Sequence, residues 1–169
     1  PMGGGKGGIT VDPKKLSSSE LEKLSRGWAR GMADILGPQK DVPAPDVNTT
    51  PEIMKWMNDE YMKVTGEKTL ATFTGKPIAD GGSEGRGPAT GLGGFYVFDV
   101  LRAKYGLPES CTVVVQGFGN VGANAAEIFA KHGHKIIAVS DSKNAIVNEA
   151  GLDIEALNAY KKENKKLEL

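Results

Sequence analysis

Apolar side chains recur at helical spacing near the start of the chain. Ser17 followed by Glu20 is a capping-box pattern, so a helix is expected to begin at about Ser18. The apolar positions that follow are Leu21, Leu24, Trp28, Met32 and Ile35. Because Gly37-Pro38 does not continue a helix, the pattern predicts that this helix ends before residue 37.

A second helix is predicted after a proline-containing loop that covers residues 41–50. Thr50 can cap this helix, Pro51 suits its first turn, and Gly66 ends it. Its predicted buried side consists of Ile53, Met54, Trp56, Met57, Tyr61 and Val64.

The second half of the chain alternates between strand and helix patterns. Residues 112–116 form a short run rich in β-branched side chains, which is typical of a strand buried on both faces of a parallel sheet. Another strand is predicted at residues 135–139, and a short β-type run covers 9–11. The predicted helices are 88–105, 120–132 and 153 to about 165. This alternation predicts an α/β protein with a parallel sheet.

Glycine is concentrated in three places rather than scattered. Fifteen of the 23 glycines lie in residues 3–8, 81–94 and 117–122, where backbone can approach a ligand closely. The glycine-rich segment that precedes the third predicted helix is a candidate hinge between two domains. We therefore expect one domain in residues 1–80 and a second that begins at residue 81.

Composition restricts the classes of partner. Twenty-one basic and 21 acidic side chains cancel, so the charge favours neither nucleic acid nor an anionic membrane, and a small-molecule ligand fits better. No apolar run approaches the roughly 18 residues of a membrane helix. Cys111 is the single cysteine, which excludes an internal disulfide and a multi-thiolate zinc site. We predict a cytoplasmic protein without a metal site.

The segment Gly117–Gly122 has the G-x-G-x-x-G spacing of dinucleotide-binding loops. It directly follows a predicted strand and opens a predicted helix. Gly117 permits the turn, Gly119 lets a pyrophosphate approach, and Gly122 lets helix and strand pack closely. We predict that NAD or NADP binds here. The predicted contacts are Gly117, Phe118, Gly119, Asn120, Val121 and Gly122.

Asp141 lies 19 positions after Gly122, at the end of the second predicted strand. An acidic residue there can accept hydrogen bonds from the adenosine ribose. The choice between NAD and NADP stays open. Ser140 and Lys143 could hold a 2′-phosphate that the aspartate would repel, or Lys143 could belong to a solvated turn.

Lys6 lies between glycines in a loop that is no Walker A motif, because Gly7 follows it instead of Ser or Thr. One interpretation is a tightly packed, partly desolvated amine with a lowered pKa, usable near a carbonyl. The other, favoured by spacing alone, is a solvated lysine. Asp46, between Pro45 and Val47, is the best acidic partner, although such an aspartate commonly only forms a turn.

Several segments together resemble the glutamate dehydrogenases of the glutamate, leucine, phenylalanine and valine dehydrogenase family, in their archaeal or bacterial form. These segments are 1–8, 41–46, 74–77, 81–86, 89–91 and 117–122. The resemblance covers essentially the whole chain. It implies part of a substrate (dimerisation) domain in residues 1–80, with the catalytic lysine loop. Residues 81–169 would then be the hinge and the first part of a Rossmann-type, doubly wound NAD(P)-binding domain.

The resemblance implies reversible oxidative deamination of L-glutamate to 2-oxoglutarate and ammonia, with NAD or NADP as cofactor. Lys6 matches the family's catalytic lysine, which polarises the substrate carbonyl, and Asp46 matches the acid/base that exchanges protons with nitrogen. Thr90 matches a threonine at the nicotinamide end, and Asn120 lies in the nucleotide loop. Arg86 lies in the same stretch and could belong to the site, but it could equally be an ion-pair partner of a nearby acid such as Glu84.

The resemblance also implies a homo-oligomer, commonly a hexamer, and a longer protein of which this chain is the middle. Substrate-anchoring lysines would lie upstream, so we expect these 169 residues to be inactive alone. Two alternatives stay open: a leucine, valine or phenylalanine dehydrogenase, and a catalytically inactive nucleotide-binding fragment.

Overall fold

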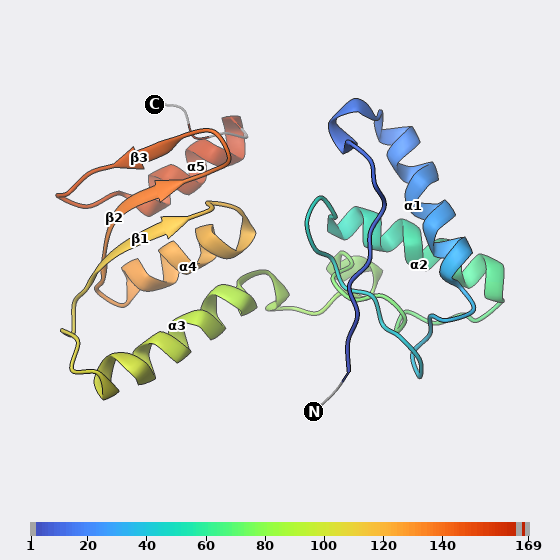
Figure 1. Cartoon of the computed structure of the whole chain (residues 1–169), viewed down its shortest axis with the longest axis horizontal. Coiled ribbons are helices and arrows are strands. Elements are labelled where there is room, and N and C mark those ends of the chain that lie inside the picture. The colour runs from blue at the N-terminus through green and yellow to red at the C-terminus, as the bar shows by residue number, and fades with distance from the viewer. Residues whose placement is uncertain (1–2, 165–166, 168–169) are drawn as a thin grey trace. The chain divides into compact units, whose positions relative to one another are not determined.

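The computed structural model describes residues 3–164 and 167. Pro1 and Met2 of the predicted lysine loop, and the predicted helix end at Lys165, lie outside the described residues. The chain divides into two compact units, one up to Ser83 and one from Glu84 onward (Figure 1).

Two helices connected by a long loop make up most of the first unit. Its elements are η1 (Pro13–Lys15), α1 (Ser18–Met32), α2 (Pro51–Thr65) and η2 (Ile78–Asp80). The predicted capping box is present, because the Ser17 backbone N–H donates to Glu20 Oε2 over 2.8 Å and Ser17 Oγ accepts from the Glu20 backbone. Thr50 caps α2, and Gly66 ends it in the left-handed conformation with φ of 75°.

The core of the first unit forms where α1 and α2 pack together. Its buried apolar residues are Ala29, Ala33, Leu36, Ile53, Met54, Met57, Tyr61 and Phe73. Two residues predicted for the buried faces are exposed instead: Ile35 is 53% exposed and Val64 is 45% exposed. Because α1 ends at Met32, Ile35 no longer follows the helical repeat. Val64 lies in the last turn of α2.

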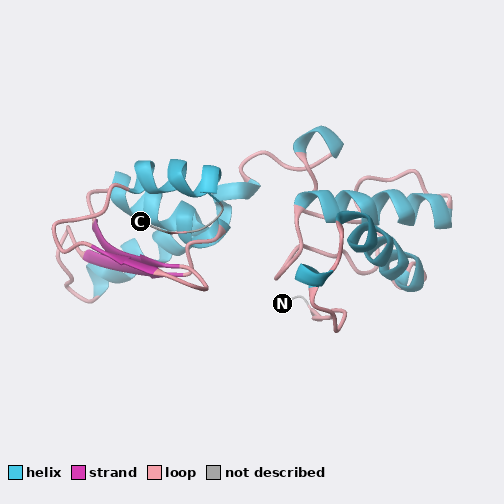
Figure 2. Ribbon diagram, turned by 90° about the horizontal axis from the view of Figure 1, so that it is seen from above, coloured by secondary structure: helices cyan, strands magenta, loops and turns pink. Residues whose placement is uncertain are grey.

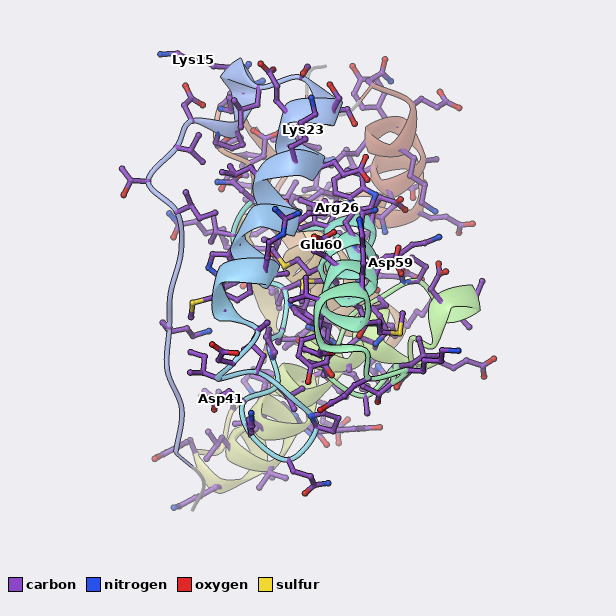
Figure 3. All side chains as sticks on the ribbon, turned by 90° about the vertical axis from the view of Figure 1, so that its right-hand side faces the viewer. Lys15, Lys23, Arg26, Asp41, Asp59 and Glu60 are labelled. Carbon is purple, nitrogen blue, oxygen red and sulfur yellow. The ribbon has the colours of Figure 1, made fainter. Side chains whose placement is uncertain are left out.

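A buried carboxylate joins the two helices. Glu60 on α2 accepts a 3.0 Å hydrogen bond from Arg30 Nε. Arg26 Nη1 lies 3.9 Å from the other carboxylate oxygen of Glu60 (Figure 3). The hydrogen bond from Arg30 lowers the pKa of Glu60, and burial opposes that shift. The α1–α2 pair is therefore held by charge-assisted hydrogen bonds as well as by its apolar core.

The second unit combines a three-stranded sheet with helices. Its elements are α3 (Arg86–Lys104), β1 (Thr112–Gln116), α4 (Asn120–Lys131), β2 (Lys135–Ser140), β3 (Ala145–Val147) and α5 (Ile154–Asn164). Figure 2 shows the strands as one layer beside the helices. The strand order is β1-β2-β3, with β1 and β2 parallel as predicted. The core contains Phe118, Ala126, Ile136, Val139, Ile154, Leu157 and Leu167.

The strands differ from the sequence pattern in three respects, of which the burial of β1 was a wrong prediction. β1 is not buried on both faces: Val113 and Val115 are half-buried, but Val114 is 65% exposed. β1 lies at the edge of the described sheet, and its Val113 and Val115 face the core that α4 completes. The sheet is not purely parallel, because β3 pairs with β2 in the antiparallel direction. Residues 9–11 form no strand in the described structure.

Of the described helices, none is long and apolar enough to cross a membrane. The described residues also contain no group of three or more His, Cys, Asp or Glu side chains that could hold a metal ion.

Candidate functional site

The glycine-rich loop between β1 and α4 has little room for side chains at its last glycine. Gly117 adopts φ of 92°, and its backbone N–H donates to Ser140 O at the end of β2 over 2.9 Å. A Cβ atom on Gly122 would lie 1.9 Å from Gly117 O. Gly122 is therefore required for the close approach of α4 to the end of β1.

Gly119 provides open space at the start of α4. It is the N-cap residue, no side chain caps the helix, and a Cβ atom there would have no neighbouring atom within 4 Å. The first N–H groups of a helix lack intrahelical partners and attract anions. Uncapped N–H groups beside open space are what a pyrophosphate requires, so these residues fit the phosphates of a dinucleotide.

Lys161 on α5 supports this loop from inside the unit. Its Nζ atom donates a hydrogen bond to Phe118 O and lies 5.3 Å from the centre of the Phe118 ring. The Phe118 ring itself is buried, with 1% exposure. Sequence reasoning missed Lys161, because a lysine in the polar end of a helix carries no pattern that distinguishes it from its neighbours.

Asn120 joins α4 to the start of α3. Its Nδ2 atom donates to Gly87 O over 3.1 Å, and a Cβ atom on Gly91 would lie 2.8 Å from the backbone nitrogen of Ala125. The two helices therefore approach closely near their N-termini. Thr90, adjacent to Gly91, is exposed at this end of α3, and Val121 is 49% exposed.

Asp141 follows β2 at the same edge of the sheet as the glycine loop. Its Oδ1 atom accepts hydrogen bonds from the backbone N–H groups of Lys143 (2.8 Å) and Asn144 (3.0 Å), and Oδ2 accepts from Leu167 N (3.1 Å). The backbone hydrogen bonds from Asn144, Lys143 and Leu167 lower the pKa of Asp141 to about 2. The carboxylate therefore shapes the β2–β3 turn, and free acceptor capacity remains on Oδ2.

Lys6 and Asp46, 40 residues apart in sequence, form an ion pair in the first unit. Lys6 Nζ donates to Asp46 Oδ2 over 2.7 Å. Asp46 Oδ1 accepts from Val47 N over 2.9 Å, and Asp46 N donates to Thr49 Oγ1 over 2.6 Å. Asn48 adopts φ of 59°, a conformation that asparagine tolerates. The turn thus leaves one oxygen of Asp46 for Lys6.

The interpretation of Lys6 as a desolvated amine with a lowered pKa is wrong for this structure. Its side chain is 89% exposed, and a Cβ atom on the flanking Gly5 or Gly7 would also meet no atom within 4 Å. The hydrogen bond to Asp46 raises the pKa of Lys6. The hydrogen bond from Lys6, and then that from Val47 N, lowers the pKa of Asp46. Both groups are therefore charged near neutral pH.

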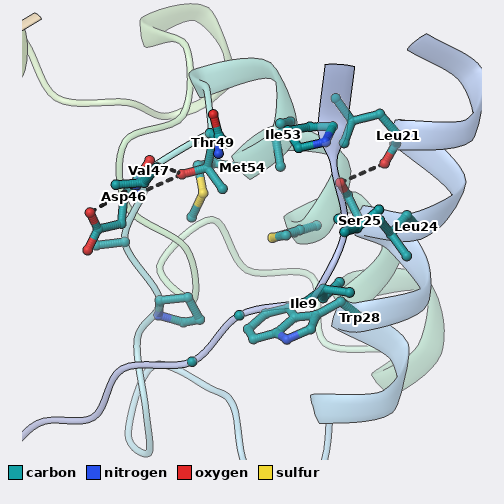
Figure 4. Close-up of a pocket in the computed structure, with 18 residues that line it drawn as sticks. Ile9, Leu21, Leu24, Ser25, Trp28, Asp46, Val47, Thr49, Ile53 and Met54 are labelled. Carbon is teal, nitrogen blue, oxygen red and sulfur yellow. Dashed lines mark hydrogen bonds between the residues drawn. The ribbon is translucent and has the colours of Figure 1, made fainter. Parts of the chain in front are cut away.

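A pocket of about 240 Å³ lies beside this ion pair (Figure 4). Asp46 and Thr49 line one side of it, whereas Leu21, Leu24 and Trp28 of α1 form an apolar wall. None of the described residues that line it is basic. The pocket can therefore place an apolar group near Asp46, but its described lining offers no cation to a carboxylate.

Arg86, the first residue of α3, forms no ion pair with Glu84 or with any other acid among the described residues. The interpretation of Arg86 as an ion-pair partner therefore gains no support.

Two family models match the chain. Residues 1–63 match the dimerisation domain of the Glu/Leu/Phe/Val dehydrogenases, and residues 81–169 match the Glutamate/Leucine/Phenylalanine/Valine dehydrogenase model.

Curated relatives match nearly the whole chain. The NADP-specific glutamate dehydrogenase of Synechocystis sp. is 48% identical over 168 residues, which are 99% of this chain and 39% of that protein. The NAD-specific glutamate dehydrogenase of Peptoniphilus asaccharolyticus is 49% identical over 174 residues, covering 99% of this chain and 41% of that protein. The chain thus spans about two fifths of the length of these relatives.

Solved structures give the same result. The hetero-hexameric glutamate dehydrogenase of Thermus thermophilus, in its leucine-bound form, aligns with a TM-score of 0.88 at 35% identity. That alignment covers 94% of this chain and 38% of the other. The glutamate dehydrogenase of Peptoniphilus asaccharolyticus aligns with a TM-score of 0.72 at 45% identity, covering 92% and 41%. These matches confirm the resemblance, and the chain belongs to the glutamate, leucine, phenylalanine and valine dehydrogenase family.

Proposed function

We propose that this chain is part of an NAD(P)-dependent glutamate dehydrogenase, which catalyses the reversible oxidative deamination of L-glutamate to 2-oxoglutarate and ammonia. The observation that carries the proposal is the 2.7 Å contact between Lys6 Nζ and Asp46 Oδ2. It brings a cation that can polarise a carbonyl next to a carboxylate that can accept a proton. The names of the curated relatives support glutamate as substrate.

The domain roles follow from the same assignment. Residues 1–80 would form part of the substrate and dimerisation domain, and residues 81–169 the hinge and the first part of the nucleotide-binding domain. Oligomerisation is supported by the name of the dimerisation-domain model, and an assembly of six subunits by the Thermus thermophilus structure, which is hetero-hexameric. A cytoplasmic location would suit a soluble metabolic enzyme of this kind.

The nucleotide would bind to the second unit. Gly117, Gly119 and the uncapped N–H groups of α4, which begin at Asn120 and Val121, would hold its pyrophosphate. Asp141 would offer an oxygen to the adenosine ribose, and Thr90 would lie at the nicotinamide end. A bound nicotinamide supplies hydride acceptance and donation. NAD and NADP both fit, since the two quoted relatives differ in this choice.

At the substrate, Asp46 would exchange protons and Lys6 would stabilise negative charge. In deamination, the Asp46 carboxylate, which is ionised at neutral pH, would accept a proton from the substrate nitrogen. The Lys6 ammonium stabilises negative charge that develops on the carbonyl or carbinol oxygen. The carboxylates of the substrate would need cations beyond the described pocket lining.

Substitution of Lys6 in the full-length protein tests the proposal. Lys6→Ala should lower the amination rate by about a thousandfold or more while the dissociation constant for the nucleotide stays within about twofold. Lys15→Ala is the matched control, because Lys15 is an exposed lysine of the same unit in a loose 3.9 Å pair with Asp12. An unchanged rate in Lys6→Ala would remove Lys6 from the mechanism.

A further inference from the structure

Lys76 is a buried lysine that the proposed chemistry does not use. Only 7% of the residue is exposed, and its Nζ atom donates to Leu70 O over 2.7 Å and to Phe73 O. Burial lowers the pKa of Lys76. A buried amine is stable only when its donors are satisfied, so the backbone of residues 70–76, here called the lysine-closed loop, is folded around this side chain.

The lysine-closed loop contacts the segment that precedes Asp46. Thr74 donates two hydrogen bonds to Pro43 O, from its backbone N–H over 2.9 Å and from Oγ1 over 3.2 Å. Gly75 has φ of 71°, and a Cβ atom there would lie 2.6 Å from Pro45 Cγ. The loop therefore meets Pro43 through hydrogen bonds and Pro45 through direct packing.

Asp46 is thus constrained from both sides in sequence. After it, the bonds to Val47 N and Thr49 Oγ1 fix the turn. Before it, the directions of Pro43 and Pro45 depend on the lysine-closed loop. Pro45 is bonded directly to Asp46, and because the proline ring fixes φ, one of the torsions that could absorb a displacement of the loop is unavailable.

We propose that Lys76 is a positioning residue, which holds the lysine-closed loop against Pro43 and Pro45 and so keeps the Asp46 carboxylate opposite Lys6. For the rate of proton transfer this inference rests on the proposed function. For the position of Asp46 it rests only on the contacts above. Small displacements of a reacting group cost large factors in rate, so an indirect support of this kind has a measurable effect.

The test uses Lys76→Met in the full-length protein, because methionine fills similar space without a hydrogen-bond donor. We expect kcat for amination of 2-oxoglutarate to fall by about tenfold to a hundredfold, with the KM for the nucleotide within about twofold of the wild type. The acidic limb of the pH–rate profile should move to higher pH, because Asp46 loses the bond from Lys6 that lowers its pKa. Lys55→Met, which breaks a partly exposed ion pair with Asp80 in the same unit, is the control and should change neither the rate nor the pH profile.

A crystal structure of Lys76→Met gives a readout independent of activity. The distance from Lys6 Nζ to Asp46 Oδ2 should exceed hydrogen-bonding range. If the wild type fails to aminate 2-oxoglutarate, the proposed function is wrong, and this distance alone decides whether Lys76 positions Asp46. Should Lys76→Met not fold, Thr74→Val takes its place, since Thr74 is exposed and the change removes only one bond to Pro43. The inference would be overturned if a folded variant kept the kcat, the pH profile and the Lys6–Asp46 distance of the wild type.

Discussion

The ammonium of Lys161 donates a hydrogen bond to the carbonyl oxygen of Phe118 and lies 5.3 Å from the centre of its ring. A residue of the last described helix thereby fixes the peptide between the first two glycines of the nucleotide loop. The bond also keeps a backbone carbonyl, which would repel a phosphate, engaged with a cation on the inner side of the loop.

Loss of this contact should weaken nucleotide binding. We predict that Lys161→Met raises the dissociation constant for the dinucleotide by roughly tenfold to a hundredfold, the effect of losing a charge-assisted hydrogen bond. Lys162→Met, at an exposed position on the same helix, should leave it unchanged. Calorimetric titration of both full-length variants measures the effect. Equal affinities in the two variants would show that the contact does not support the loop.

Two glycines of the same loop should respond differently to alanine. Gly122→Ala places a Cβ 1.9 Å from Gly117 O, so it should destabilise the second unit by about 3 kcal/mol or more. Gly119→Ala meets no atom within 4 Å and has a negative φ of −87°, so the protein should fold normally. Its methyl group would occupy the space proposed for the pyrophosphate.

Thermal unfolding and nucleotide titration distinguish the two variants. Gly122→Ala should lower the melting temperature, whereas Gly119→Ala should keep the melting temperature and lose nucleotide affinity. Wild-type affinity in Gly119→Ala would argue against a pyrophosphate at this position.

The stability of the second unit should depend on the protonation of His134. The Nδ1 atom of His134 accepts a 3.1 Å hydrogen bond from the backbone N–H of Cys111, and the ring lies against Phe98 and Phe129. Burial lowers the pKa of His134 from its ordinary 6.5, and the charge of Arg102 adds to this. Asp99 opposes the shift, and His132 adds slightly to it.

The sign of the pH dependence follows from this lowered pKa. The neutral ring is favoured in the folded state, so its contribution is fully present above about pH 6.5 and is lost as the pH falls towards the folded pKa. Over that window the free energy of unfolding should fall by up to about 1.4 kcal/mol per pH unit. Thermal unfolding of the wild type and of His134→Gln, which cannot be protonated, measures it. The same pH slope in both proteins would contradict the assignment.

Local signals predicted most of the regular structure. The Ser17–Glu20 capping box and the Thr50-Pro51 start are side-chain effects that act within one turn, so they are visible in the sequence. β3 was missed because it is only three residues long and depends on pairing with β2. The burial of Val114 was misjudged because a β-branched run does not say which faces of a sheet are covered.

The candidate site was predictable where motif spacing determines it and not where distant side chains meet. The glycine loop was placed correctly between β1 and α4. Asp46 was selected as the acidic partner of Lys6, but the exposure of Lys6 depends on which other segments pack against its loop, and residue spacing does not give this. Lys161 and Lys76 donate hydrogen bonds to backbone carbonyl oxygens. Every residue has such an oxygen, so the sequence does not show which residue a lysine will contact in this way.

The most direct test of the proposed activity is an assay of ammonia-dependent oxidation of NADH and NADPH by the full-length protein, with 2-oxoglutarate compared against branched-chain and aromatic 2-oxo acids. We predict that 2-oxoglutarate is preferred by about a hundredfold or more in kcat/KM, as expected when a substrate carboxylate is recognised by buried polar groups. A preference for a branched-chain or aromatic 2-oxo acid, or no turnover of any of them, would contradict it.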